Sequence, residues 1–217
     1  MIMRKTLLKI CFALVLMISM SCSKDDFSWA SRFNEDYAGT YRLASATFAP
    51  DSIYSETNPI DFDKSGEKTK DIVKGLGITS QDLSLMDVGV NAQQNVPYSG
   101  GTGRLTFLVP VQSVEKTGDK LALRLPNYVL CPIHFYYSIG KDGDLELLKT
   151  GDLTELYSYN EVYGGVEKNP QLVKCNEAKM IKFKDGEIVF SVNLCYVDWT
   201  DGTQITNTAS YFTFKRN

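Results

Sequence analysis

Three Asp-Gly turn signals in the second half of the chain constrain its fold more than any other feature. They lie at Lys141–Asp144, Lys184–Glu187 and Thr200–Thr203, each between runs in which apolar and polar residues alternate. Asp-Gly favours a tight hairpin because both central residues of a type I′ turn need a positive φ. Strands joined by such turns pair with their sequence neighbours, so we expect an antiparallel meander. A meander closes most simply into an up-and-down barrel, which removes exposed sheet edges.

The predicted strands cover much of the chain after residue 37. They are Tyr37–Ala49, Arg104–Ser113, Lys120–Leu125, Pro132–Ile139, Leu145–Leu148, Ala178–Phe183, Glu187–Trp199 and Thr203–Lys215. Pro110 suggests an edge or a bulge in the second of them. The region Asp51–Gly103 carries turn residues and two helix-capable pieces, Glu67–Leu76 and Ser80–Met86. We therefore expect a mainly all-β fold, with one or two short helices between the first and second strands.

Residues 1–21 are typical of a secretory signal peptide. Three basic residues precede the apolar run Ile10–Met20, which is too short to span a membrane stably. Small Ser21 then precedes Cys22, as a cleavage site beside a lipidated cysteine requires. We expect residues 22–36 to form the lipidated cysteine and its tether, and residues 37–217 to form one domain. The alternatives are an uncleaved signal anchor and a secreted protein with a chance cysteine.

Composition excludes one class of partner and limits disulfides. Removal of the signal peptide moves the formal charge from −3 to −6. An acidic domain without a basic block is a poor candidate for nucleic acid, so we expect no nucleic-acid partner. Cys131, Cys175 and Cys195 remain after Cys11 is removed and Cys22 is lipidated. They allow at most one disulfide, for instance Cys175–Cys195, and Cys195 is equally explained as a small buried residue.

The segment Asp61-Phe62-Asp63-Lys64-Ser65-Gly66, with Asp71 beyond it, is the sharpest local motif. Alternating oxygen-bearing side chains around a glycine turn suit calcium, which takes six to eight oxygen ligands. Ile72 stands where an EF-hand would have its bidentate glutamate, so the EF-hand reading fails. A looser calcium loop of Asp61, Asp63, Ser65 and Asp71 remains one alternative. The other is a turn that caps the following helix through its side-chain oxygens.

Nothing in the sequence forms a marked catalytic set. His134 is the single histidine and lies in a predicted strand, where we expect it to be hydrogen-bonded to its surroundings. The phosphate-binding loop, the nucleophile elbow and the zinc-protease motif are all absent from the sequence. We therefore expect a protein that is not an enzyme and has no cofactor apart from the calcium just considered.

Aromatic residues are the remaining candidates for a binding site. Three tyrosines of a Tyr-, Gly- and Asn-rich loop could form a sugar-stacking platform with a tryptophan: Tyr157, Tyr159, Tyr163 and Trp199. Strand aromatics that face the interior could instead bind an apolar ligand: Phe107, Phe135, Tyr137, Phe190 and Phe212. The alternative is that these rings fill the core, since an eight-stranded barrel is just wide enough to be packed solid or to hold one small ligand.

Several short motifs together resemble the lipocalin-like lipoproteins of Bacteroidetes. Gly39–Ala46 resembles their opening strand, with Tyr41 in place of a tryptophan. Ile60–Gly66 resembles their acidic-glycine segment, with Ser65 in place of an aspartate, and Tyr211–Lys215 resembles their closing strand. Ser23-Lys24-Asp25-Asp26 behind Cys22 resembles the surface-export signal of such lipoproteins. The resemblance implies a calycin-type β-barrel of unknown function, lipid-anchored in the outer membrane and displayed at the cell surface.

These observations lead to three functional hypotheses. The first is a lipid-anchored envelope protein that binds a small hydrophobic or amphipathic ligand, or a glycan, without catalysis. The second is a structural or adaptor lipoprotein that docks on an outer-membrane partner through an exposed apolar patch. The third is an enzyme with paired carboxylates in a cleft, a pattern of glycoside hydrolases.

Overall fold

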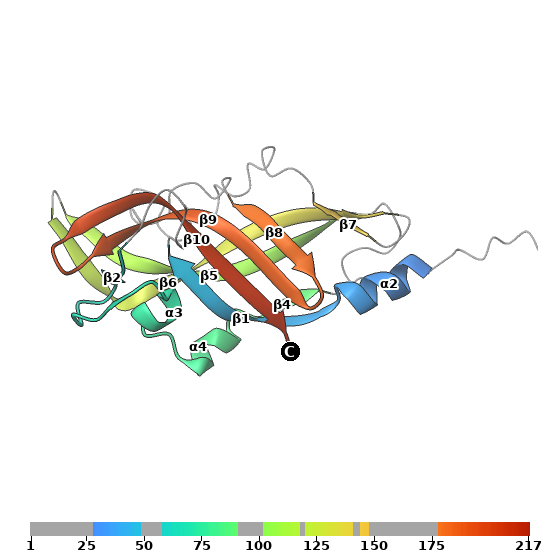
Figure 1. Ribbon diagram of the computed structural model, residues 1–217, viewed down its shortest axis with the longest axis horizontal. Coiled ribbons are helices and arrows are strands. Elements are labelled where there is room, and N and C mark those ends of the chain that lie inside the picture. The colour runs from blue at the N-terminus through green and yellow to red at the C-terminus, as the bar shows by residue number, and fades with distance from the viewer. Residues whose placement is uncertain (1–27, 49–57, 91–101, 118–119, 141–143, 148–177) are drawn as a thin grey trace, which may run out of the picture.

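The computed structural model describes residues 28–48, 58–90, 102–117, 120–140, 144–147 and 178–217 (Figure 1). Three short helices precede or interrupt a series of strands. In chain order the elements are α2 (Ser28–Asp36), β1 (Gly39–Phe48), β2 (Ile60–Asp61), β3 (Lys68–Thr69), α3 (Ile72–Gly75), α4 (Ser80–Ser84), β4 (Val88–Val90), β5 (Thr102–Thr117), β6 (Lys120–Ile139), β7 (Leu145–Leu147), β8 (Lys179–Lys184), β9 (Glu187–Asp198) and β10 (Thr203–Arg216).

The strands form two larger antiparallel sheets and one small hairpin. One sheet has the order β4-β1-β10-β9-β8, the second has the order β5-β6-β7, and β2 pairs with β3. The sheets curl into a half-barrel (Figure 1). The prediction of a mainly β, antiparallel fold is thus confirmed, and the short helices α3 and α4 lie between β1 and β5 as expected.

Two of the three Asp-Gly turns are described, and both connect neighbouring strands. Asp185 and Gly186 join β8 to β9 with φ values of 57° and 71°, the two positive angles that a type I′ turn requires. Gly202 joins β9 to β10 with a φ of 79°. The third turn includes residues 141–143, which lie outside the described residues, but its flanks pair as a hairpin through Ile139 and Leu145.

The strands differ from the expected ones in two places. The runs Lys120–Leu125 and Pro132–Ile139 were expected as two strands but form the single β6. The β5–β6 register runs from Gln112 opposite Tyr128 to Val114 opposite Leu123, so β6 continues through a large bulge. The three-residue β4 pairs with the start of β1 and was not predicted, because so short a segment has no measurable alternation.

A helix occupies most of the segment expected to be only a tether. Helix α2 begins at Ser28, and its buried face carries Phe33, which contacts Tyr37 four positions later at 5.4 Å between ring centroids. The mostly polar composition of this segment predicts only a tether. Phe33 packs the helix on the sheets, and a helix held by such packing does not have to be stable alone.

Strand β10 brings the C-terminal end of the described chain beside its N-terminal end. It pairs with β1 along its length, so the last strand lies beside the first. Arg216 extends from the end of β10 and donates hydrogen bonds to the carbonyls of Glu35 and Asp36 at the end of α2, at 3.0 and 2.6 Å. Its guanidinium also lies 5.5 Å from the ring centroid of Tyr41 in β1. A cation at a helix C-terminus stabilises the helix, so Arg216 holds α2 against the sheet.

The molecule therefore has two distinct ends, called here the proximal end and the distal end. The proximal end carries α2, the β8–β9 turn and Asp144, which forms an ion pair with Arg32 of α2 at 2.9 Å. The distal end carries the β9–β10 turn, the β5–β6 turn and the loop Asp61–Gly66 (Figure 1). The long strands β5, β6, β9 and β10 run between these two ends.

Candidate functional site

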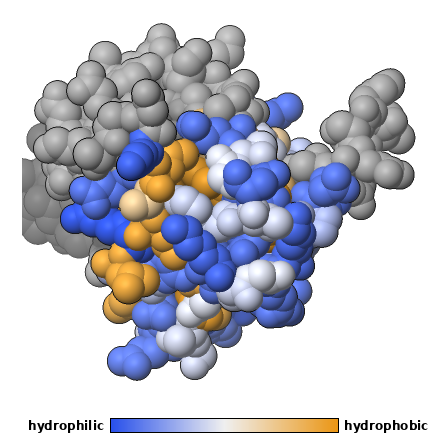
Figure 2. Space-filling model, turned by 90° about the vertical axis from the view of Figure 1, so that its left-hand side faces the viewer, coloured by the Kyte–Doolittle hydropathy of each residue, from blue (hydrophilic) through white to orange (hydrophobic). Residues whose placement is uncertain are grey.

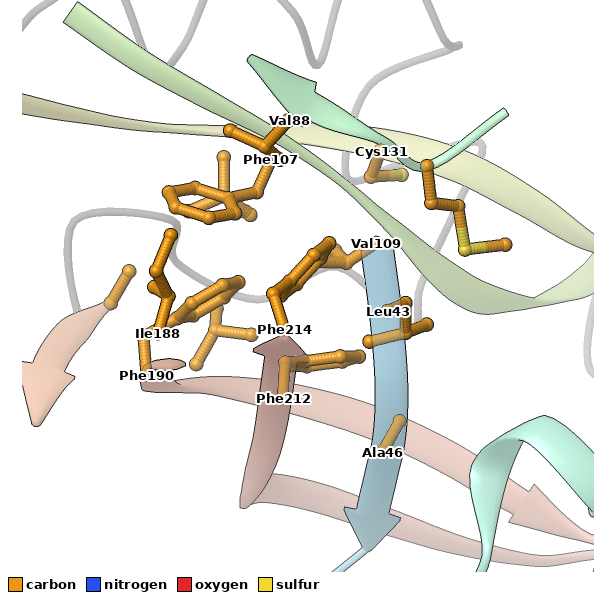
Figure 3. Packing of buried hydrophobic residues seen from close by; sticks show 14 of the residues in the cluster. Leu43, Ala46, Val88, Phe107, Val109, Cys131, Ile188, Phe190, Phe212 and Phe214 are labelled. Carbon is orange, nitrogen blue, oxygen red and sulfur yellow. The ribbon is translucent and has the colours of Figure 1, made fainter. Parts of the chain in front are cut away.

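Five phenylalanines from four strands meet between the two larger sheets, and Figure 3 labels four of them. Their side chains are at most 2% exposed, and they are Phe107 of β5, Phe135 of β6, Phe190 of β9, and Phe212 and Phe214 of β10. The Phe190 ring lies at the centre, with ring-centroid distances of 4.8 Å to Phe107 and 5.3 Å to Phe135. Phe212 and Phe214 lie 5.5 and 6.0 Å from it.

These ring contacts place four of the predicted interior aromatics in one packed cluster. Their strands alternate, so Phe107, Phe135, Phe190 and Phe212 point inward as expected. Centroid distances of about 4.5–7 Å are those of aromatic pairs in direct contact. At this level the space between the sheets is therefore filled by protein side chains. Phe214 belongs to the same cluster and was missed, although its position two residues after Phe212 places it on the same face.

Tyr137, the fifth predicted interior residue, lies elsewhere. It is fully buried near α2, with its ring 6.2 Å from that of Phe33. Its neighbour across the β5–β6 pair is Gly103, where an added Cβ would lie only 2.4 Å from the Tyr137 ring. A side chain at position 103 would therefore collide with Tyr137. The glycine allows Tyr137 to close the proximal end of the core.

His134 has the surroundings expected of a strand histidine. Its side chain is fully buried on β6, and its Nδ1 lies 2.9 Å from the hydroxyl of Thr106, the residue directly opposite on β5. The expectation that His134 is hydrogen-bonded to its surroundings is thus confirmed.

The loop Asp61–Gly66 is organised by its own side-chain oxygens. The Asp61 carboxylate accepts the backbone N–H groups of Asp63 and Gly66 at 3.1 and 2.9 Å. Asp63 and Ser65 accept the N–H groups two residues further on. Gly66 has a φ of 84°, which reverses the chain. Asp71 caps α3 by accepting the N–H of Lys74 at 3.1 Å. This is the capped turn that the sequence left open as an alternative.

The same contacts bear on the predicted calcium loop. Asp61, Asp63, Ser65 and Asp71 each accept a backbone N–H, which a bound cation would have to share. Within the part of the chain that the structure describes, no three His, Cys, Asp or Glu side chains gather closely enough to hold a metal ion. The described geometry is that of a turn whose side-chain oxygens accept its own backbone N–H groups. Calcium binding stays a prediction from the sequence.

Trp199 lies at the distal end, in the β9–β10 turn beside the acidic loop. Its backbone N–H donates to the carbonyl of Asp61 at 2.9 Å. The ammonium of Lys64 lies 4.4 Å from the centroid of its ring, a cation–π contact. One face of the predicted stacking residue is thus occupied by Lys64. The three tyrosines expected beside it, at positions 157, 159 and 163, lie outside the described residues, as do Cys22 and Cys175.

Gln112 and Asp198 join the distal loop to the sheets, and sequence reasoning identified neither. The fully buried Gln112 amide donates to the carbonyls of Phe62 and Val197 at 2.8 and 3.0 Å, and its oxygen accepts the N–H of Val197 at 2.7 Å. Asp198 accepts the N–H groups of Asp61 and Thr200 at 3.2 and 3.0 Å. Only the aspartate at the first position of a turn could have drawn attention to this group.

The environment of Asp198 predicts acid sensitivity. Burial alone would raise the pKa of its carboxyl, but hydrogen bonds from Thr200 and Asp61 and the charge of Lys68 outweigh burial and lower the pKa. A carboxyl whose pKa is lower in the folded state stabilises the protein above its unfolded-state pKa of about 3.9 and loses this contribution as the pH falls through the folded value.

We therefore expect Asp198→Asn to lower the free energy of unfolding at pH 7, and the deficit to shrink as the pH falls below about 4. Urea unfolding of both proteins across this range measures it. A deficit that stays constant with pH would mean that Asp198 acts by shape alone and that its charge contributes nothing.

Comparisons with protein-family models, curated proteins and solved structures found no match. The candidate site therefore rests on geometry alone. It is the distal end, where Gln112 and Asp198 fix the acidic loop and the Trp199 turn in one arrangement.

Proposed function

We propose that this chain is a lipid-anchored protein of the bacterial outer membrane, displayed at the cell surface, whose β domain docks on an outer-membrane protein. The anchor is Cys22, and its support is the apolar run, the small residue before the cysteine and the lysine and two aspartates behind it. Among the helices that the structure describes, none is long and apolar enough to cross a bilayer. Stable attachment would come from the acyl chains of the lipidated cysteine.

We further propose that the strands form one eight-stranded barrel. Strand order supports this, because β8-β9-β10-β1-β4 and β5-β6-β7 become one up-and-down series if β4 lies beside β5 and β7 beside β8. The residues between these pairs, 91–101 and 148–177, lie outside the described ranges. An eight-stranded barrel closes around one layer of inward side chains.

The packed phenylalanine cluster is the observation that favours docking over binding of a ligand in the interior. Because these rings contact one another between the sheets, an apolar ligand would have to displace them to enter at this level. A protein with a filled interior binds through its outer surface. The distal end offers an apolar contact there, since Leu125 of β6 is 82% exposed. Figure 2 views this end and shows apolar side chains gathered among hydrophilic ones.

The distal end is also fixed in shape before a partner arrives. The hydrogen bonds of Gln112 and Asp198 hold the acidic loop and the Trp199 turn, so little ordering is needed on binding. Burial of a leucine side chain contributes about 1.5–3 kcal/mol. Loss of Leu125 should therefore weaken docking by about ten- to a hundredfold.

Photo-crosslinking tests the docking surface. We expect a crosslinking amino acid at position 125 of the full-length chain, in the envelope of producing cells, to form one discrete adduct with a membrane protein. The matched control is position 181, because Ile181 is another exposed apolar strand residue, on β8. An adduct of the same mass at both positions, or no adduct at position 125, would contradict docking through the distal end.

Ligand binding in the interior is the second candidate. Its support is the strand order, because barrels of eight strands include those that hold one small ligand. A hydrophobic or amphipathic ligand, or a glycan at Trp199, would bind without catalysis. Whether the phenylalanine cluster admits such a ligand distinguishes the two candidates.

A further inference from the structure

The length of chain before α2 limits how far the domain can lie from its proposed anchor. Five residues, 23–27, separate Cys22 from Ser28, the first residue of α2. A fully extended chain spans at most about 3.3–3.6 Å per residue, so Ser28 lies within about 20 Å of the lipidated cysteine. The start of α2 must therefore stay close to the bilayer surface.

Helix α2 is fixed to the domain by contacts in its C-terminal half. Its buried residue Phe33 packs against the rings of Tyr37 and Tyr137. Arg216 binds the last carbonyls of the helix, and the same guanidinium donates to the hydroxyl of Tyr41 at 3.0 Å. Because the helix cannot turn independently of the sheets, the short tether constrains the whole domain.

The distal end lies far from this point. Strand β5 has 16 residues, and strands rise about 3.3 Å per residue, so β5 and the β6 residues paired with it span about 50 Å. This pair runs between the β5–β6 turn at the distal end and the proximal end, where Asp144 meets Arg32. In Figure 1 α2 and the β9–β10 turn lie at opposite ends of the long axis.

From these distances we infer that the protein's proximal end is its membrane-facing surface, apposed to a phospholipid bilayer, and that the distal end with Trp199 and Leu125 points away from the membrane. This inference rests on the proposed anchor at Cys22. It deepens the proposed function, because a partner must then reach the docking surface several tens of ångströms above the lipid headgroups. A partner whose surface lies entirely within the bilayer could not reach the distal end.

Energy transfer to labelled lipids tests the orientation. Full-length lipidated protein is placed in phosphatidylcholine–phosphatidylglycerol vesicles that carry a headgroup acceptor. A donor is attached through a non-natural side chain either at Asn34 of α2 or at Asp201 of the β9–β10 turn, both exposed. We expect transfer from position 34 to exceed that from position 201 by at least about twofold, since about 50 Å separates the two ends. Equal transfer, or more from position 201, would overturn the inference.

Two further variants separate the causes. Cys22→Ser should abolish flotation with vesicles; if the unchanged protein floats no better than this variant, the anchor and the orientation both fail. If the unchanged protein floats but transfer is equal at both positions, the orientation alone fails. Ten Gly/Ser residues inserted after Asp26 add a flexible span of about 18 Å and should lower transfer from position 34. Unchanged transfer in that variant would contradict control by the tether.

Discussion

Replacement of Phe190 by alanine is expected to lower the free energy of unfolding by about 4 kcal/mol. Large-to-small changes at buried aromatic positions cost about 3–5 kcal/mol, from lost transfer energy and from the cavity left behind. Phe190 is fully buried and its ring contacts four others from three strands, so the neighbours cannot fill the cavity without movement of those strands. Urea unfolding followed by fluorescence measures the loss.

Two controls accompany this variant. Phe190→Leu keeps most of the volume and should cost about half as much. Ser191→Ala changes the neighbouring residue, which points away from the cluster, and should change stability by less than about 0.5 kcal/mol. A loss below about 1 kcal/mol in Phe190→Ala would show that the cluster is not a packed core.

The same variant separates the two candidate functions. A filled interior predicts that the unchanged protein does not take up a fatty-acyl fluorophore, whereas Phe190→Ala gains a cavity for a small aromatic molecule. If instead the unchanged protein binds the fluorophore at one site and Phe190→Ala weakens that binding, the interior is the ligand site. Ligand binding would then replace docking as the proposed function.

Gln112→Ala is expected to lower the free energy of unfolding by a comparable amount, about 4 kcal/mol. It removes three hydrogen bonds and leaves the carbonyls of Phe62 and Val197 and one N–H buried without that partner. Each such group costs about 1–3 kcal/mol. Because Gln112 is also the link between β5 and the distal loop, loss of docking should accompany the loss of stability. Thermal and urea unfolding measure the first, and the crosslink at position 125 measures the second.

Gln112→Glu tests whether hydrogen-bond chemistry or shape is responsible. The size is unchanged, but an oxygen replaces the amide nitrogen that donates to two carbonyls. We expect destabilisation at neutral pH that lessens in acid, where the protonated acid can donate one hydrogen bond. Gln204→Ala changes an exposed glutamine of β10; it is the matched control and should be nearly neutral. If Gln112→Ala is as mild as Gln204→Ala, the amide does not hold the loop.

Local signals predicted most of the sheet, and non-local contacts explain what they missed. Asp185-Gly186 and Asp201-Gly202 encode their turns through residues that tolerate positive φ, so the pairing of β8, β9 and β10 could be read directly. Helix α2 could not, because its stability comes from packing on Tyr137 about a hundred residues away. The separate runs Lys120–Leu125 and Pro132–Ile139 predict two strands, yet the pairing with β5 continues through the bulge between them.

The residues of the candidate site could likewise be predicted only in part. Alternation placed Phe107, Phe135 and Phe190 on the inner face, but whether inner residues line a cavity or contact one another depends on how close the sheets lie. That separation is set by every core residue together. Gln112 carried no signal, since its partners Phe62 and Val197 are 50 and 85 residues distant. A polar residue in a strand looks the same whether it faces solvent or a buried carbonyl.

The pairing of β1 with β10 has a consequence for how such a chain is made. Tyr41 and Arg216 are 175 residues apart, and they meet only after the ribosome has released the last strand. Contacts so distant in sequence form slowly because the connecting chain must be closed first. A growing chain thus lacks this partner of its first strand until β10 has been made. The proposed export would benefit from this delay, because a polypeptide whose first and last strands have not yet paired can still pass through a translocation channel.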